Sequence, residues 1–282
     1  MKKKLHRTYA RLSPTFSVQA QDQYNQDRVV SIAGESPLTL IVDGHEVVTL
    51  MTLGTYPEEL AIGYLRNQRL VEHIDHIASV EVDWQREAVM VKLKDAYTIK
   101  DWQEKLKKRI ITSGCGQGTV FSCTLDKLYD QRLADVQLKQ STIYALLKEI
   151  TLYNEIYRAA GAVHGCALCK DTEILAFVED VGRHNAADAI AGMMCLEEID
   201  GTDKIFYTTG RLTSEIVMKT AHMSIPILLS RSGITQMGLQ LAKDLNVMMI
   251  ARAKGKAFLV YHKHEQINYD ASPTPPPAGR RT

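Results

Sequence analysis

Residues 204–251, "KIFYTTGRLTSEIVMKTAHMSIPILLSRSGITQMGLQLAKDLNVMMIA", carry the clearest secondary-structure pattern of the chain. Short apolar runs alternate here with longer segments whose apolar residues recur at helical spacing. The apolar runs are 204–209, 225–230 and 247–251, and the helical segments are 213–223 and 235–245. Apolar strands that alternate with helices of about ten residues are typical of α/β units with a mainly parallel sheet.

The same pattern continues on both sides of this stretch. "EILAFVED" (173–180) predicts a strand and "NAADAIAGMMCLEE" (185–198) a helix, and "KAFLVYH" (256–262) predicts a last strand. "STIYALLKEITLYNEIYRAAG" (141–161) has the periodicity of an amphipathic helix that ends at a glycine. Together these elements predict one α/β domain over residues 136–265.

The N-terminal half has a different pattern, with paired strands and a single helix. "PLTLIVDGHEVVTLMTL" (37–53) predicts a hairpin because Asp-Gly between apolar runs favours a tight turn. "YPEELAIGYLRNQRLV" (56–71) predicts a helix and residues 77–93 a second pair of strands. We therefore expect an N-terminal α+β portion over 26–135. The polar residues 1–25 and the proline-rich residues 266–282 are expected to be poorly ordered.

Composition excludes several classes of protein. The 282 residues include 34 basic and 33 acidic side chains, so the net charge of +1 argues against a dedicated nucleic-acid binder. No apolar run approaches the roughly 18 residues that cross a membrane, and no apolar segment follows the basic N-terminus to make a secretory signal. These features predict a cytoplasmic protein without a membrane partner. Its five cysteines (115, 123, 166, 169 and 195) are then expected to be reduced thiols or ligands.

Three predicted strand ends carry cationic loops, "TTGRLTSE" (208–215), "SRSGIT" (230–235) and "ARAKGKA" (251–257). Ligands of open α/β sheets bind at the carboxyl ends of the strands, where helix N-termini attract anions. Arg211 and Arg231 add guanidinium donors suited to phosphate. One such loop alone is equally well a capped helix with a solvated arginine, but three of them on one edge favour a large polyanionic ligand. No loop matches the ATPase P-loop or the Rossmann glycine pattern.

Two further motifs leave alternatives open. "EDVGRHNAADAIAG" (179–192) places Asp180, Arg183, His184 and Asn185 in a strand-to-helix turn, with Asn185 as a candidate N-cap. These side chains have either a capping and ion-pairing role or a functional one.

Cys123 and Cys195 lie in apolar surroundings and are interpreted as core residues.

"VHGCALC" (163–169) permits a catalytic zinc held by His164, Cys166, Cys169 and a water, which would make the protein a hydrolase or deaminase. The sequence has no second ligand pair, and the glutamate of the deaminase H-x-E motif is replaced by Cys166. If the segment is a strand, the two cysteines also point to opposite faces. We therefore expect no metal ion, and the zinc enzyme remains the alternative.

"ITSGCGQGT" (111–119) presents Cys115 between glycines, downstream of a lysine-rich segment. Gly114, Gly116 and Gly118 offer no side chains to cover the thiol, and nearby cations and amides lower a thiol pKa. Cys115 is therefore a candidate nucleophile, and a structural turn residue is the other interpretation.

The stretches 179–192 and 208–235 and the "SGCG" loop resemble the FdhD family, sulfur carriers needed to make active formate dehydrogenase. The resemblance extends from Pro37 to Tyr261. It implies a sulfurtransferase of the persulfide carrier type that takes sulfur from a cysteine desulfurase. The sulfur would pass to the molybdenum bis(guanine dinucleotide) cofactor before its insertion into formate dehydrogenase. The implied fold is a cytidine-deaminase-like α/β domain with an N-terminal extension, and the implied assembly is a homodimer.

The resemblance places the persulfide on Cys115. The cofactor-binding residues that it implies are Arg252, Ala253, Lys254, Gly255, Lys256 and Ala257. Many members carry C-x-x-C in the loop, whereas Gly118 stands at the second position here, so a resolving thiol is missing from the loop. A cofactor chaperone in which Cys115 is structural is a further alternative.

Overall fold

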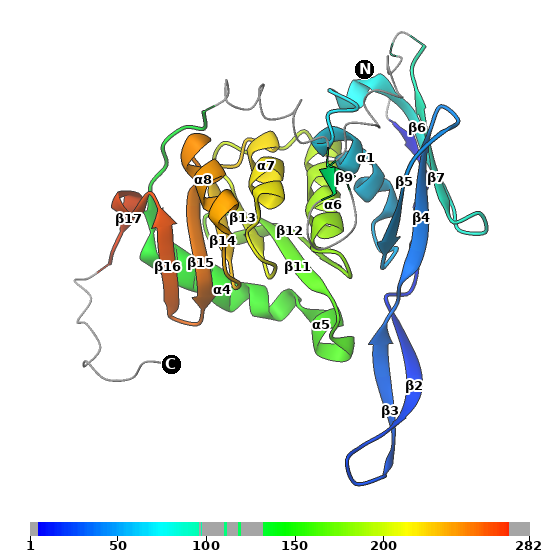
Figure 1. Cartoon of the computed structure of the whole chain (residues 1–282), viewed down its shortest axis with the longest axis horizontal. Helices are drawn as coiled ribbons and strands as arrows, with labels where there is room; N and C mark the ends of the chain where they lie inside the picture. Colours follow the sequence, from blue (N-terminus) through cyan, green and yellow to red (C-terminus); the bar gives the residue numbers. More distant parts are fainter. Residues whose placement is uncertain (1–4, 96, 98–109, 112–117, 120–131, 271–282) are drawn as a thin grey trace.

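The protein folds into two principal β-sheets joined by a pair of crossing helices (Figure 1). The structure is a computed structural model and describes residues 5–95, 97, 110–111, 118–119 and 132–270. The N-terminal sheet has the strand order β1-β6-β7-β4-β5. Its strands are β1 (His6–Arg7), β4 (Ser36–Val42), β5 (His45–Thr52), β6 (Ile77–Asp83) and β7 (Ala88–Leu93).

The predicted hairpin over residues 37–53 is confirmed as β4 and β5. Asp43 and Gly44 form its turn, with φ of 47° and 81°. Positive φ at both central residues belongs to the tight turn whose twist matches antiparallel strands. The predicted strand pair over 77–93 is confirmed as β6 and β7.

A two-stranded arm extends from the N-terminal sheet and was not predicted. It consists of β2 (Thr15–Gln21) and β3 (Asp27–Ala33), paired antiparallel along their whole length (Figure 1). The prediction that residues 1–25 are poorly ordered is therefore wrong for residues 5–25, since β1 and β2 lie there. Strand β1 is ordered by partners remote in sequence, since it pairs with β6 and Arg7 Nη1 bonds Glu59 Oε1 at 2.9 Å, whereas β2 pairs with the next strand β3.

The C-terminal sheet has the order β12-β11-β13-β14-β15-β16. Its strands are β11 (His164–Lys170), β12 (Glu173–Asp180), β13 (Ile205–Thr208), β14 (Ile227–Ser230), β15 (Met248–Lys254) and β16 (Ala257–His262). Only β13–β14 and β14–β15 are parallel. The prediction of a mainly parallel sheet is wrong for the other three strand pairs, β12–β11, β11–β13 and β15–β16, which are antiparallel. Short turns join β11 to β12 and β15 to β16, and such connections allow only antiparallel pairing. The sheet is therefore mixed.

Helices cover both faces of this sheet. One face packs on α4, and the other packs on α6, α7 and α8. The helices are α4 (Gln140–Tyr153), α5 (Glu155–Ala160), α6 (Arg183–Leu196), α7 (Ser214–His222) and α8 (Gln236–Asp244). The single helix predicted over 141–161 is broken at Asn154, whose φ of −75° and ψ of 59° are not helical.

Helix α1 (Pro57–Asn67) joins the two halves by packing on α6. The helices approach so closely that a Cβ added to Gly63 would lie 1.7 Å from the backbone oxygen of Asp188. A Cβ added to Gly192 would lie 1.9 Å from the backbone oxygen of Glu59. One apolar cluster consequently runs from Leu40 in the N-terminal sheet to Met249 in the C-terminal sheet.

The described part of the C-terminal tail is paired. Ile267–Asn268 forms β17 beside β10 (Leu138–Lys139), so the tail predicted to be disordered from residue 266 is ordered at its start. Residues 271–282 lie outside the described part of the chain. Among the residues that the structure describes, no helix is long and apolar enough to cross a membrane.

Candidate functional site

The three cationic loops predicted from the sequence lie together at the carboxyl ends of β13, β14 and β15. We call this end of the C-terminal sheet the cationic edge. Ser230 Oγ donates to the Gly210 carbonyl oxygen at 2.7 Å, and Leu212 N donates to the Gly233 oxygen at 3.0 Å. Arg252 N donates to the Ser232 oxygen at 2.9 Å. The loops meet because β13, β14 and β15 are parallel, which confirms the predicted juxtaposition. The side chains of Arg211, Arg231, Arg252 and Lys254 are all exposed there.

Residues 252–257 comprise the end of β15, the turn at Gly255 and Lys256, and the first residue of β16; we call this stretch the turn 252–257. Ala253 is fully buried and anchors the turn, whereas Arg252, Lys254 and Lys256 are exposed. Arg252 has a φ of 52° at an irregularity in the β15–β16 register, and Gly255 has a φ of 60°. Positive φ at a bulky residue is uncommon, and such strain concentrates at binding sites. The turn is thus a firmly anchored platform that presents three cationic side chains.

A hydrogen-bonded carboxylate fixes the start of α6. Asp180 Oδ1 accepts from Gly182 N at 2.8 Å and from Asn185 Nδ2 at 2.9 Å. Its Oδ2 accepts from Thr52 Oγ1 at 2.5 Å and from Leu53 N at 3.0 Å. The N-cap is Gly182, so the prediction that Asn185 caps the helix is wrong. Asn185 instead helps to bind the first turn of α6 to the end of β5.

A buried ionic network joins α6 to α7 and α1. Lys219 Nζ lies 2.6 Å from each carboxylate oxygen of Asp188, and Asn67 Nδ2 donates to Asp188 Oδ1 at 2.7 Å. His184 Nε2 lies 3.3 Å from Glu215 Oε2. Burial lowers the pKa of the His184 imidazole to about 2, so the ring is neutral at physiological pH. The network holds the helices that begin at the cationic edge.

The cysteine pair of the zinc alternative lies on opposite faces of β11. Cys166 packs in the core formed with α6, and Cys169 packs in the core formed with α4. Burial raises the pKa of both thiols to about 12. Two thiols on opposite faces cannot ligate one metal ion together with His164. No group of three His, Cys, Asp or Glu side chains in the described residues is placed to hold a metal.

His164 begins β11 at the cationic edge. Its Nδ1 lies 3.4 Å from Thr209 Oγ1, which accepts from Gly165 N at 3.0 Å. Burial and the charges of Arg183 and Arg211 lower the pKa of this imidazole. His164 is therefore neutral at physiological pH and is available as a hydrogen-bonding group.

Cys115 and Cys123 lie outside the described residues, so the assignment of the persulfide remains a prediction. The residues that flank the Cys115 segment, Ile110–Ile111 and Gly118–Thr119, pair antiparallel as β8 and β9. Cys195 is half-buried against the core, and burial raises its pKa.

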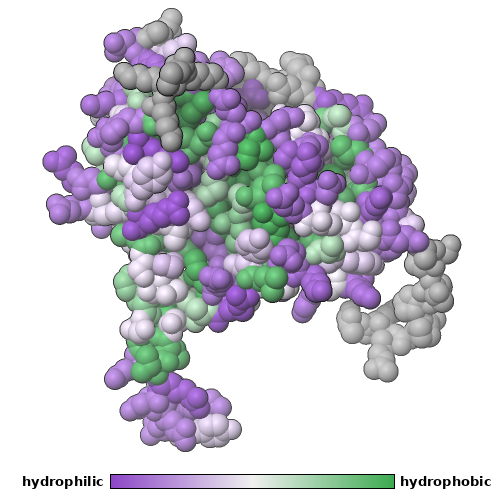
Figure 2. Space-filling model, turned by 180° about the vertical axis from the view of Figure 1, so that it is seen from behind, coloured by the Kyte–Doolittle hydropathy of each residue, from purple (hydrophilic) through white to green (hydrophobic). Residues whose placement is uncertain are grey.

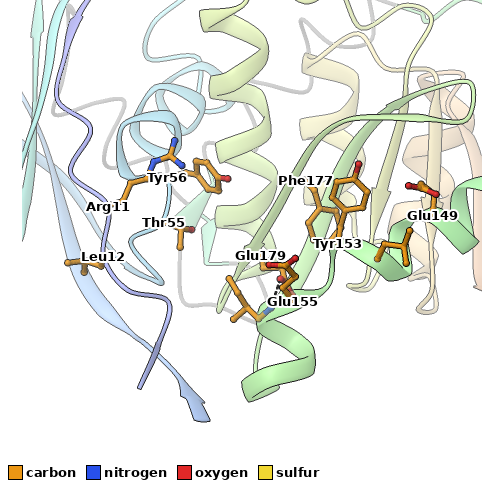
Figure 3. Close-up of a pocket in the computed structure, with 11 residues that line it drawn as sticks. Arg11, Leu12, Thr55, Tyr56, Glu149, Tyr153, Glu155, Phe177 and Glu179 are labelled. Carbon is orange, nitrogen blue, oxygen red and sulfur yellow. Dashed lines mark hydrogen bonds between the residues drawn. The ribbon is translucent and has the colours of Figure 1, made fainter. Parts of the chain in front are cut away.

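A cavity of about 640 Å³ that the sequence did not predict lies where the N-terminal portion meets α4, α5 and β12 (Figure 3). Arg11 stacks on Tyr56 at one side, with its Cζ 4.4 Å from the ring centroid. Glu179, at the other side, accepts from Ile156 N and Tyr157 N at 2.9 Å each, and burial raises its pKa. Glu179 thereby holds the first turn of α5. No local sequence motif predicts this cavity, because the residues that line it come from segments far apart in the sequence.

Comparisons with known proteins agree with this architecture. The FdhD/NarQ family profile matches residues 33–268. The chain is 32% identical over 254 residues to "Sulfur carrier protein FdhD" of Bacillus licheniformis, covering 89% of this chain and 92% of that protein. The Bacillus subtilis protein of the same name is 32% identical over 243 residues, covering 86% and 91%. The crystal structure of a protein from Desulfotalea psychrophila, described as a formate dehydrogenase accessory protein, superposes with a TM-score of 0.71 at 25% identity. This match covers 90% of this chain and 98% of that one.

Proposed function

Because the chain belongs to the FdhD/NarQ family, we propose that it carries sulfur as a persulfide on Cys115 for the maturation of a formate dehydrogenase. The Cys115 thiolate attacks the outer sulfur of a cysteine desulfurase persulfide and releases the desulfurase thiolate. The carried sulfur then passes to the molybdenum bis(guanine dinucleotide) cofactor. That cofactor is cargo here, and the transfer needs no metal ion of the protein's own. The reduced thiols Cys166, Cys169 and Cys195 support a cytoplasmic site of action.

The observation that carries this proposal is the convergence of three cationic loops at one sheet edge. A bis-dinucleotide cofactor has two pyrophosphate groups, and guanidinium donors bind phosphate oxygens in a bidentate manner. The exposed side chains of Arg211, Arg231, Arg252 and Lys254 lie on neighbouring loops. The turn 252–257 adds a glycine at which phosphate can approach the backbone. We assign the phosphates of the guanine dinucleotides to this edge.

The buried thiols of β11 do not replace the missing second cysteine of the Cys115 loop. A thiol with a pKa of about 12 is almost entirely protonated at neutral pH, and the thiolate is the reactive form. We therefore propose that sulfur leaves Cys115 by direct transfer and that Cys166 and Cys169 take no part in it.

Intact mass spectrometry tests the sulfur carrier. After incubation with a cysteine desulfurase and cysteine, the wild-type protein is expected to gain the mass of one sulfur atom, and Cys115→Ala is expected to gain none. Cys195→Ala is the matched control and should gain the same mass as the wild type. A Cys115→Ala protein that still gains sulfur would show that another thiol is the carrier. A wild type that gains no sulfur but binds the nucleotide would favour the cofactor chaperone.

Removing one ammonium group from the cationic edge is expected to weaken nucleotide binding. Charge-assisted hydrogen bonds contribute about 1.5–3 kcal/mol, so Lys254→Ala should raise the Kd for GDP about tenfold or more. Lys170→Ala is the control, because Lys170 is an exposed lysine at the opposite edge of the same sheet. Isothermal titration calorimetry measures both. If Lys254→Ala and Lys170→Ala bind GDP with equal affinity, GDP does not bind at the turn 252–257.

We also propose that the protein acts as a homodimer and that residues 136–265 have the cytidine-deaminase-like fold. The arm β2–β3 supports the first point. Apolar side chains lie along its stalk and polar ones at its tip (Figure 2), and Phe16, Val29 and Ile32 are each about half exposed or more. Exposed apolar surface of this kind marks an interaction site. The mixed sheet with helices on both faces supports the second point.

A further inference from the structure

Arg183 is a buried cation at the start of α6. Its residue is only 4% exposed, and its Nε and Nη2 atoms have no hydrogen-bond partner among the described residues. A guanidinium keeps its charge at any physiological pH. The nearby Asp180 carboxylate accepts four hydrogen bonds from other groups. Because an unpaired buried charge is strongly unfavourable, an arginine in this position calls for an anion.

The surroundings of Arg183 suit an anion from several sides. A Cβ added to Gly210 would lie 2.7 Å from Arg183 Cδ, so the arginine stem packs directly over the loop that ends in Arg211. The charges of both arginines lower the pKa of His164, which places all three groups in one electrostatic environment. Arg183, Arg211 and His164 thus converge at the carboxyl end of β13.

Two helix N-termini at this edge also lack side-chain caps. Helix α6 begins after Gly182, which has no side chain. Helix α7 begins after Thr213, whose Oγ1 is buried without a hydrogen-bond partner in the described part of the chain. The third helix at this edge differs, because Thr235 Oγ1 accepts from Gly238 N at 3.1 Å and caps α8. A helix start without a side-chain cap favours an anion with several oxygens.

We propose that Arg183 binds a phosphate group at the carboxyl end of β13, together with the uncapped first turns of α6 and α7. This inference rests on the proposed function for the identity of the ligand, a guanosine nucleotide. It extends the site inward from the exposed Arg211 and adds a residue that the motif 252–257 does not include. Phosphate suits the position because it offers negative charge and three or more acceptor oxygens to donors from different directions.

The test uses Arg183→Met, which keeps an unbranched stem as far as the position of Nε and removes the charge. Calorimetry with GDP and with inorganic pyrophosphate is expected to show affinity reduced at least tenfold for both, and Arg183→Lys should lose less. The free Arg183→Met protein should also melt at a higher temperature than the free wild type, because an uncompensated buried charge is gone. Arg86→Met is the matched control, since Arg86 is an exposed arginine of the N-terminal sheet, and it should change neither property.

Unchanged affinity of Arg183→Met for both probes would overturn the inference, and so would a wild type that binds neither probe. If Arg183→Met fails to fold, the Arg183→Lys variant is the test. An Arg183→Lys protein with the affinity of the wild type for GDP and pyrophosphate and with the same melting temperature would overturn the inference. The persulfide test is independent of these outcomes. A wild type that gains sulfur on Cys115 but binds no phosphate refutes the role of Arg183 and the assignment of the phosphates to this edge, and it leaves the sulfur carrier intact. Loss of phosphate affinity in a chain that never gains sulfur refutes only the sulfur carrier.

Discussion

Gly63→Ala is expected to lower the free energy of unfolding by about 3 kcal/mol, the upper end of the usual cost of overpacking, because the neighbouring atom is rigid backbone. The added methyl group would stand 1.7 Å from the backbone oxygen of Asp188 on α6. A backbone atom cannot rotate away as a side chain can, so the two helices would have to separate. Separation would open the apolar contacts that α1 and α6 share.

Urea denaturation followed by circular dichroism measures this loss. Gly233→Ala is the matched control, because no atom lies within 4 Å of the added methyl group and its backbone φ is not in the left-handed region. Its stability should stay within about 1 kcal/mol of the wild type. A Gly63→Ala protein as stable as Gly233→Ala would contradict the close crossing of α1 and α6.

Lys219→Met is expected to cost about 3–5 kcal/mol of stability, the usual loss when one partner of a buried ion pair is removed. Asp188 is fully buried, and Lys219 Nζ contacts both of its carboxylate oxygens at 2.6 Å. Without the ammonium group, Asp188 Oδ1 keeps the hydrogen bond from the Asn67 amide, and the carboxylate loses its cation. Burial already raises the pKa of Asp188, so the variant should take up a proton there.

A double-mutant comparison separates the ion pair from general disruption. Asp188→Asn/Lys219→Met carries no buried charge at these two positions and should be more stable than Lys219→Met alone. Lys170→Met removes the exposed ion pair with Asp203 and should change stability by less than about 1 kcal/mol. A double variant less stable than Lys219→Met would show that the buried charge of Asp188 is not the source of the loss.

Local patterns were enough to predict most elements of the C-terminal half. The strand and helix alternation over 204–251 appears in the structure with boundaries shifted by no more than three residues. The hairpin at Asp43 was predictable because the required backbone conformation is encoded by two adjacent residues. Periodicity and turn chemistry depend on near neighbours, which a sequence displays directly.

Features that depend on distant partners were not predictable. Nothing in residues 5–25 shows that β1 pairs with β6, which sets His6 opposite Ser79. The approach of Gly63 to Asp188 joins residues 125 positions apart, and a glycine in a helical pattern does not reveal what it contacts. The antiparallel edges of the C-terminal sheet follow from the turns at Asp171 and Gly255, which alternation alone does not distinguish from longer crossovers.

The candidate site also has features that local sequence predicts and features that depend on distant contacts. The loops that carry Arg211, Arg231 and Arg252 could be placed together from the sequence, because parallel strands end at a common edge. The burial of Arg183 could not be predicted from the sequence, since it depends on how α6 packs over Gly210. The proposed opposite orientation of Cys166 and Cys169 was correct because it needs only the two-residue repeat of a strand. Cys115 stays a prediction.

The apolar cluster shared by the two sheets has a consequence for how the chain unfolds. Because α1 and α6 belong to one cluster that reaches both sheets, opening either half exposes the apolar surface of the other. Regions coupled in this way open as one cooperative unit instead of two separate foldons. A chain cut near residue 135 would therefore yield two incomplete pieces, one with α1 and one with α6, and each helix would lose the cover of the other. An anion that steadies the first turn of α6 would in turn slow hydrogen exchange in the N-terminal sheet.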